Sequence, residues 1–138
     1  MSIECINLAL SNRCNAKCIW CPKTRGSKHY FDMPFETVKK IIDEVADPSF
    51  PWQIKMLHLS ENGEALYNKD FLDIVRYIKA KLPNTALNLL SNFGMFKPEI
   101  AKVLFEEKLL SSIQMNVDGH DAKSYRAVKG ISYKGVIK

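Results

Sequence analysis

Residues 54–90 of this 138-residue chain are IKMLHLSENGEALYNKDFLDIVRYIKAKLPNTALNLL, and they decide the fold. The apolar run Ile54–Leu59 is typical of a buried strand, and the polar turn Ser60–Glu64 follows it. A helix is predicted next, ending near Pro83-Asn84, before a second strand at Ala86–Leu90. The apolar positions of this helix, at helical spacing, are Phe71, Ile74, Val75 and Ile78. Strand, helix and strand in this order predict a βαβ unit with parallel strands.

The same alternation continues upstream. The apolar run Ile6–Leu10 predicts a first strand, and a long polar loop extends from Ser11 to about Met33. A helix is then predicted with Pro34 at its first helical position and Glu36 in its first turn. Its apolar residues at helical spacing are Val38, Ile41, Ile42 and Val45.

Downstream, a helix is predicted from near Pro98, a fourth strand at Ile113–Val117, and a short helical piece near Asp121–Val128. The apolar positions expected on the helix after Pro98 are Ile100, Val103, Leu104 and Leu109. Every polar loop follows the carboxyl end of a strand, which is the edge where parallel α/β folds bind ligands. We therefore expect the active site at this edge.

Four strand–helix units predict an α/β fold with a parallel sheet and right-handed crossovers. The length is typical of one domain, so we expect a single domain over residues 1–138. Residues 130–138 resemble the approach to a further helix, and a four-strand sheet would leave two open edges. We therefore expect an incomplete, TIM-barrel-like partial (β/α) barrel, truncated after about four strand–helix units.

Composition narrows the class of protein. The 46% hydrophobic content is normal for a globular domain, and the net charge of +5 does not by itself indicate a nucleic-acid partner. No apolar run approaches the roughly 20 residues that cross a bilayer, and Met1–Glu4 shows no secretory signal. We expect no membrane or nucleic-acid partner and a cytoplasmic, reducing location. There the four cysteines serve as metal ligands or core residues rather than disulfides.

The strongest chemical signal is the segment CNAKCIWC at residues 14–21. Cys14, Cys18 and Cys21 have C-x3-C-x2-C spacing, in the loop directly after the first strand. Thiolates are the usual protein ligands of iron–sulfur clusters. One loop with this spacing can bind three irons of a cubane cluster and leave the fourth iron open to a substrate.

Two other readings of the triplet remain open. Structural zinc needs four ligands, and the nearest candidates for the fourth are His29 and Cys5. The pair Cys18 and Cys21 also has the C-x-x-C spacing of redox-active thiols.

The triplet resembles the hallmark of the radical S-adenosylmethionine (SAM) superfamily, C-x3-C-x-aromatic-C after the first barrel strand, with Trp20 at the aromatic position. The resemblance implies a [4Fe–4S] cluster on Cys14, Cys18 and Cys21, and SAM bound to its open iron. It implies that an electron from the cluster cleaves SAM to a 5′-deoxyadenosyl radical, which abstracts hydrogen from a substrate. No catalytic residue is assigned beyond the cluster ligands.

The same resemblance extends to the other strand ends. Asn62-Gly63-Glu64 resembles the family's Gly-Gly-Glu motif, which contacts the SAM amino group, although asparagine replaces the first glycine. The residues that the resemblance assigns to SAM binding are Trp20, near the adenine, Asn62, Gly63, Glu64, Ser91, Asn92, and, near the ribose, Asn116 and Asp118. Taken alone, residues 62–64 would be read as an ordinary Asn-Gly turn with a solvated Glu64, but beside the cysteine triplet the motif reading is preferred.

The sequence therefore predicts a radical SAM enzyme, or part of one, that acts on an unknown substrate and receives electrons from a donor such as a flavodoxin or ferredoxin. Two alternatives stay open: an iron–sulfur electron-transfer module and a zinc-stabilised binding module. Neither the substrate nor the oligomeric state can be inferred from the sequence.

Overall fold

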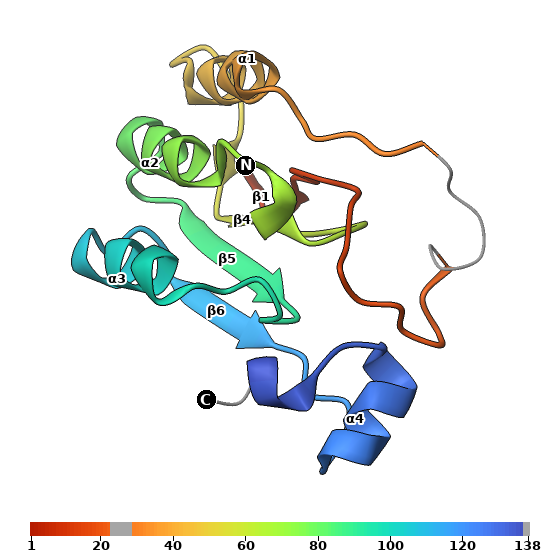
Figure 1. Ribbon diagram of the computed structural model, residues 1–138. Coiled ribbons are helices and arrows are strands. Elements are labelled where there is room, and N and C mark those ends of the chain that lie inside the picture. The colour runs from red at the N-terminus through yellow and green to blue at the C-terminus, as the bar shows by residue number, and fades with distance from the viewer. Residues whose placement is uncertain (23–28, 137–138) are drawn as a thin grey trace.

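The computed structural model describes residues 1–22 and 29–136 (Figure 1). The strands are β1 (Ser2–Ile3), β2 (Ile6–Asn7), β3 (Gln53–Ile54), β4 (Met56–His58), β5 (Ala86–Ser91) and β6 (Ser112–Met115). The helices are α1 (Phe35–Ala46), α2 (Phe71–Lys81), α3 (Pro98–Glu106) and α4 (Ala122–Lys129), with short 3-10 turns η2 (Ala65–Tyr67) and η3 (Tyr133–Gly135). Part of the predicted polar loop, residues 23–28, lies outside the described residues.

Within the described ranges the strands form a four-stranded sheet in the order β2-β4-β5-β6, and every pairing is parallel. In the sequence, β1 comes just before β2, and β3 comes just before β4. Strands β1 and β3 pair with each other in parallel, so the pairing of these two extended segments is only briefly interrupted before it continues between β2 and β4. Helices α1, α2 and α3 cover one side of the sheet, and α4 lies beyond the carboxyl end of β6 (Figure 1). The prediction of a parallel α/β fold is confirmed.

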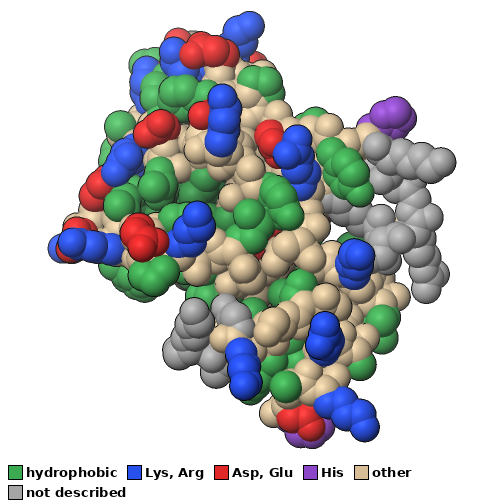
Figure 2. Space-filling view, in the orientation of Figure 1, with side chains coloured by type: hydrophobic (Ala, Val, Ile, Leu, Met, Phe, Trp, Pro, Cys, Tyr) green, Lys and Arg blue, Asp and Glu red, His purple; other side chains and the backbone are tan. Residues whose placement is uncertain are grey.

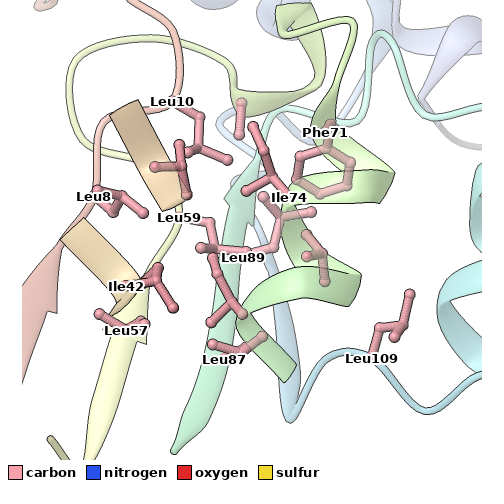
Figure 3. Packing of buried hydrophobic residues seen from close by; sticks show 14 of the residues in the cluster. Leu8, Leu10, Ile42, Leu57, Leu59, Phe71, Ile74, Leu87, Leu89 and Leu109 are labelled. Atoms are coloured by element: carbon pink, nitrogen blue, oxygen red, sulfur yellow. The ribbon is translucent and has the colours of Figure 1, made fainter. Parts of the chain in front are cut away.

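The core forms where alternate strand residues meet the apolar stripes of the helices. Leu57, Leu87 and Leu89 of the strands are buried, as are Ile42 of α1 and Ile74 of α2 (Figure 3). Fully burying one such side chain stabilises a fold by about 1.5–3 kcal/mol relative to leaving it exposed. This packing holds the carboxyl ends of the strands, and hence the loops after them, in fixed positions.

Basic and acidic side chains are interspersed over the outer faces of the helices (Figure 2). Lys81 of α2 pairs with Asp43 of α1 at 2.7 Å, and Arg76 of α2 pairs with Glu107, just after α3, at 2.6 Å. Exposed pairs of this kind contribute little stability, so the helices are held mainly by their buried faces. None of the described helices is long and apolar enough to cross a membrane.

Three predicted strands are longer than the observed ones. The expected strand Ile54–Leu59 is interrupted at Lys55, between β3 and β4, and β4 ends at His58. The expected strand Ile6–Leu10 is β2 only over Ile6–Asn7, because the Leu10 carbonyl oxygen accepts a hydrogen bond from the loop residue Met33 at 2.8 Å rather than from β4. The expected strand Ile113–Val117 is β6 over Ser112–Met115, and its pairing with β5 ends there.

Two predicted helix positions also differ. Pro34 is the residue before the first turn of α1, with an extended ψ of 142°, rather than its first helical residue. Leu109 is buried but lies beyond α3, since the chain leaves the helix after Glu106 and Lys108 adopts a positive φ of 50°. The apolar spacing continues past the end of the helix because Leu109 packs on the same core from a loop.

Candidate active site

A cavity of about 310 Å³ opens at the carboxyl ends of the parallel strands. All of the predicted site residues except Asp118 line this cavity, including the three cysteines of the loop after β2. The residues come from the loops after β2, β4, β5 and β6, which the parallel sheet brings to one edge. The structure therefore gathers at one place residues that are scattered from position 14 to position 116 in the sequence.

The three cysteines of the loop are partly buried and influence one another. The backbone N–H of Cys21 donates a hydrogen bond of 3.1 Å to the carbonyl oxygen of Cys18. Burial raises the pKa of the Cys18 thiol, the Lys129 ammonium lowers it, and the nearby Cys14 and Cys21 raise it further. Within residues 1–22 and 29–136, no group of three or more His, Cys, Asp or Glu side chains is arranged to hold a single metal ion.

Gly63 is in close contact with the start of the cysteine loop. A β-carbon at Gly63 would lie 2.6 Å from the carbonyl oxygen of Arg13 and closer still to that of Ser11. The next residue, Glu64, donates its backbone N–H to the Arg13 carbonyl oxygen at 2.7 Å. The close approach that requires glycine at this position is therefore to the backbone of residues 11–13. The turn after β4 and the cysteine loop are therefore packed as one unit.

Glu64 is only 1% exposed although it lines the cavity. One carboxylate oxygen accepts a hydrogen bond from the Ser91 hydroxyl at 2.9 Å, and the other accepts one from the backbone N–H of Asn92 at 3.0 Å. Burial raises the pKa of the Glu64 carboxyl, and the bonds from Asn92 and Ser91 oppose that rise. A buried carboxylate held in this way is a strong acceptor for a cation that enters the cavity.

Lys129, which the sequence analysis did not single out, also lines the cavity. It is 4% exposed and pairs with Asp118, which explains why Asp118 points to the lysine rather than lining the cavity. Buried lysines are rare and nearly always paired. Basic residues are common in the last turn of a helix, and Lys129 is one of two in the last turn of α4. The sequence alone therefore does not indicate that Lys129 is buried at the cavity.

The remaining cavity residues differ in exposure. Trp20 is 55% exposed, and Asn116 directly follows β6. Ser60 was also missed by sequence analysis. Its hydroxyl oxygen is buried and has no hydrogen-bond partner in the described part of the chain, although Ser60 lines the cavity. An ordered water or a bound polar group can satisfy a buried hydroxyl of this kind.

A parallel β/α sheet with a three-cysteine loop at its carboxyl edge is the arrangement expected of a partial (β/α) barrel. The sequence model of the Radical SAM superfamily matches residues 8–138, so the chain belongs to this enzyme superfamily. Its members typically use a [4Fe–4S] cluster and SAM, and generate radicals from SAM.

Two curated relatives are similar in sequence. One is the tungsten-containing aldehyde ferredoxin oxidoreductase cofactor-modifying protein of Pyrococcus furiosus, 30% identical over 72% of this chain and 26% of the relative. The other is the mycofactocin maturase MftC of Mycolicibacterium smegmatis, 25% identical over 91% of this chain and 30% of the relative. The chain therefore spans between about a quarter and a third of the length of these proteins.

Solved structures share the fold. The crystal structure of BtrN in complex with AdoMet and 2-DOIA matches with a TM-score of 0.74 at 17% identity, over 93% of this chain and 52% of that one. Native anSMEcpe with bound AdoMet matches with a TM-score of 0.70 at 18% identity, over 96% of this chain and 36% of that chain. Methylornithine synthase (PylB) matches with a TM-score of 0.67 at 19% identity, over 99% of this chain and 40% of that chain. These matches confirm the expected TIM-barrel-like partial barrel.

Proposed function

We propose that this chain is a single domain, residues 1–138, that binds a [4Fe–4S] cluster on Cys14, Cys18 and Cys21 and binds SAM beside it. The observation that supports this most is that the three thiols line the same cavity as the buried Glu64 carboxylate. Three thiolates spread around a cavity suit a cluster of several irons, each binding one thiolate. Zinc fits less well, since structural zinc takes four ligands and the thiols that line the cavity number three.

When bound together, the cluster and SAM supply a radical that abstracts hydrogen from a substrate. The chain's own residues bind and orient the cofactor. Glu64 offers its buried carboxylate to the SAM amino group, and the unpartnered Ser60 hydroxyl is available to a polar group of SAM. Gly63 and Asn62 shape the wall between that carboxylate and the cysteine loop.

Other residues complete the proposed site. Trp20 lines the outer part of the cavity, where it can stack on the adenine, and Asn116 can bond the ribose hydroxyls. Ser91 and Asn92 hold Glu64 in place. Asp118 pairs with Lys129, so we propose that it acts on the site through that lysine.

The proposal includes a cytoplasmic location and a one-electron donor such as a flavodoxin or ferredoxin. A one-electron carrier of this kind can reduce a [4Fe–4S] cluster, and a reducing compartment keeps the three thiols available as ligands. The proposal assigns no substrate.

Anaerobic reconstitution with iron and sulfide tests the cluster. The purified chain is expected to bind about four irons and an equal amount of acid-labile sulfide. Cys14→Ala, Cys18→Ala and Cys21→Ala should each lose most of this iron. Cys5→Ala is the matched control, because Cys5 is exposed and outside the cavity, and it should keep all of it. Equal iron in all four variants would rule the proposal out.

Reduction of the reconstituted chain in the presence of SAM tests the second half of the proposal. Formation of 5′-deoxyadenosine is expected with wild type and not with the three cavity cysteine variants. A fully loaded chain that forms none would favour the electron-transfer alternative.

A further inference from the structure

Asn92 uses every polar group of its side chain. Its Oδ1 accepts a hydrogen bond from the backbone N–H of Gly94 at 2.8 Å. Its Nδ2 donates to Oδ1 of Asn15 at 2.9 Å and lies 3.5 Å from the sulfur of Cys14, within hydrogen-bond range of sulfur. One side chain on the loop after β5 is therefore bonded to the cysteine loop after β2.

The orientation of this amide is fixed by its bond with Gly94. An asparagine side chain can be turned by 180° with little change in shape, which exchanges its oxygen and nitrogen. Here the Gly94 backbone N–H can bond only to an oxygen, so it fixes which end of the Asn92 amide is Oδ1. This bond selects the orientation in which an N–H group of Asn92 faces Asn15 and the Cys14 sulfur.

The backbone around Asn92 holds the side chain in place. Asn92 is 8% exposed, and its backbone N–H donates to the buried Glu64 carboxylate at 3.0 Å. Phe93 adopts a positive φ of 59°, and its N–H donates to the Ser91 hydroxyl at 3.0 Å. A tight turn with these bonds leaves the Asn92 amide little freedom to move away from the cysteine loop.

We propose that Asn92 is a positioning residue for the cluster: its N–H···S hydrogen bond fixes Cys14 and raises the cluster's reduction potential. This inference rests on the proposed function, because it requires the cluster on Cys14. Reduction adds one electron to the cluster, and part of its negative charge is on the ligand sulfurs. A donor aimed at such a sulfur stabilises the reduced state, and such bonds are among the features that set iron–sulfur potentials.

A redox titration of the anaerobically reconstituted chain, followed by electron paramagnetic resonance, measures the effect. Asn92→Leu keeps the approximate shape and removes both N–H groups. Asn92→Asp keeps the oxygen that accepts from Gly94 and replaces the donor by a negative oxygen. Both variants should have a more negative midpoint potential than wild type, with the larger shift in Asn92→Asp.

Asn116→Leu is the matched control, because Asn116 lines the same cavity from the loop after β6, whereas Asn92 is the residue of the loop after β5 whose side chain contacts Cys14. Its potential, measured without SAM, should stay at the wild-type value. An Asn92→Leu chain with full cluster content and the wild-type potential would overturn the inference. The same holds if Asn116→Leu shifts the potential as far as Asn92→Leu does.

A second measurement needs no change at Asn92. Wild-type chain with 15N in its asparagine side chains should show a nitrogen hyperfine coupling to the reduced cluster, and Asn116→Leu should retain that coupling. Absence of the coupling in a loaded wild-type chain would also overturn the inference. A wild-type chain that takes up no cluster is a different result, since it contradicts the proposed function before Asn92 is tested.

Discussion

The backbone N–H of Lys17 donates a hydrogen bond of 2.8 Å to the carbonyl oxygen of Lys129. Two residues further along the loop, Ile19 bonds in the same way to the carbonyl oxygen of Val128 at 3.1 Å. These bonds flank Cys18 and join the cysteine loop to the last turn of α4, where Lys129 pairs with Asp118. The geometry of the loop therefore depends on how firmly the end of α4 is held.

We expect Lys129→Met to destabilise the chain by roughly 3 kcal/mol, because it leaves Asp118 without its buried partner. Denaturant unfolding of the metal-free chain measures this, and reconstituted Lys129→Met should also hold less iron. Arg126→Met, on the exposed side of the same helix, should change stability by less than about 0.5 kcal/mol. Equal stability of the two variants would show that the Lys129–Asp118 pair does not hold α4.

The capping residue at the start of α4 also contributes to holding this helix, and its loss should have a smaller effect on stability. Asp121 caps the helix by accepting a hydrogen bond from the Ser124 N–H at 2.7 Å. Asp121→Ala should cost about 1 kcal/mol in the free energy of unfolding. Asp70, which precedes α2 and makes no side-chain capping bond, is the matched control, and Asp70→Ala should cost clearly less. A larger loss at Asp70 would contradict the capping assignment.

Gly63→Ala should destabilise the chain by about 1–3 kcal/mol, because the added methyl group collides with backbone of residues 11–13 that has no easy way to move. The reconstituted variant should bind less iron than wild type, since the displaced backbone leads directly into Cys14. Glu61→Ala, two residues away and exposed, should leave both quantities unchanged. Wild-type stability and iron content in Gly63→Ala would refute the close packing of the two loops.

The pH dependence of stability should reveal the buried carboxyl of Glu64. Burial raises its pKa above the ordinary value of 4.5, so its ionised form is less stable in the folded chain than in the unfolded one. Its contribution to folding is therefore most favourable at low pH and declines as the pH rises through the raised pKa.

Glutamine at this position does not titrate, so the stability of Glu64→Gln relative to wild type should increase between about pH 4.5 and about pH 7.5. Urea unfolding of both chains at the two pH values measures the difference. Asp43→Asn is a useful contrast, because hydrogen bonds from Lys81 and Tyr77 lower the pKa of the Asp43 carboxyl below its ordinary value of 3.8. Asp43 is therefore ionised in both the folded and the unfolded chain at these two pH values, and the stability of Asp43→Asn relative to wild type should stay nearly constant between them. A relative stability of Glu64→Gln that falls with rising pH would contradict the burial effect.

The sequence predicted most of the fold because apolar periodicity is a local property. The helix and the second strand of residues 54–90 appear where the pattern places them, and Pro98 begins α3 as expected. The first strand of that stretch is interrupted at Lys55. Strand ends were less well predicted. Leu10 is as apolar and buried as a strand residue, but its backbone bonds to Met33, a choice that depends on how the loop folds back.

Part of the candidate site could also be predicted, because its main signals are local features of the sequence. The spacing of the cysteines and the polar strand ends are visible in the sequence, and parallel topology is enough to bring them to one edge. Lys129 and Ser60 were not predicted, because they matter to the site only through being buried beside the cavity, and the sequence does not show that burial. A lysine at a helix end and a serine at a strand end are unremarkable until the surrounding atoms are known.

The central claim is that the cluster on Cys14, Cys18 and Cys21 has an open iron that binds SAM. The most direct test is the electron paramagnetic resonance spectrum of the reduced, reconstituted chain, recorded before and after SAM is added. The claim predicts that SAM changes the spectrum of the wild-type chain and of Cys5→Ala alike. A fully loaded cluster whose spectrum is the same with and without SAM would contradict it.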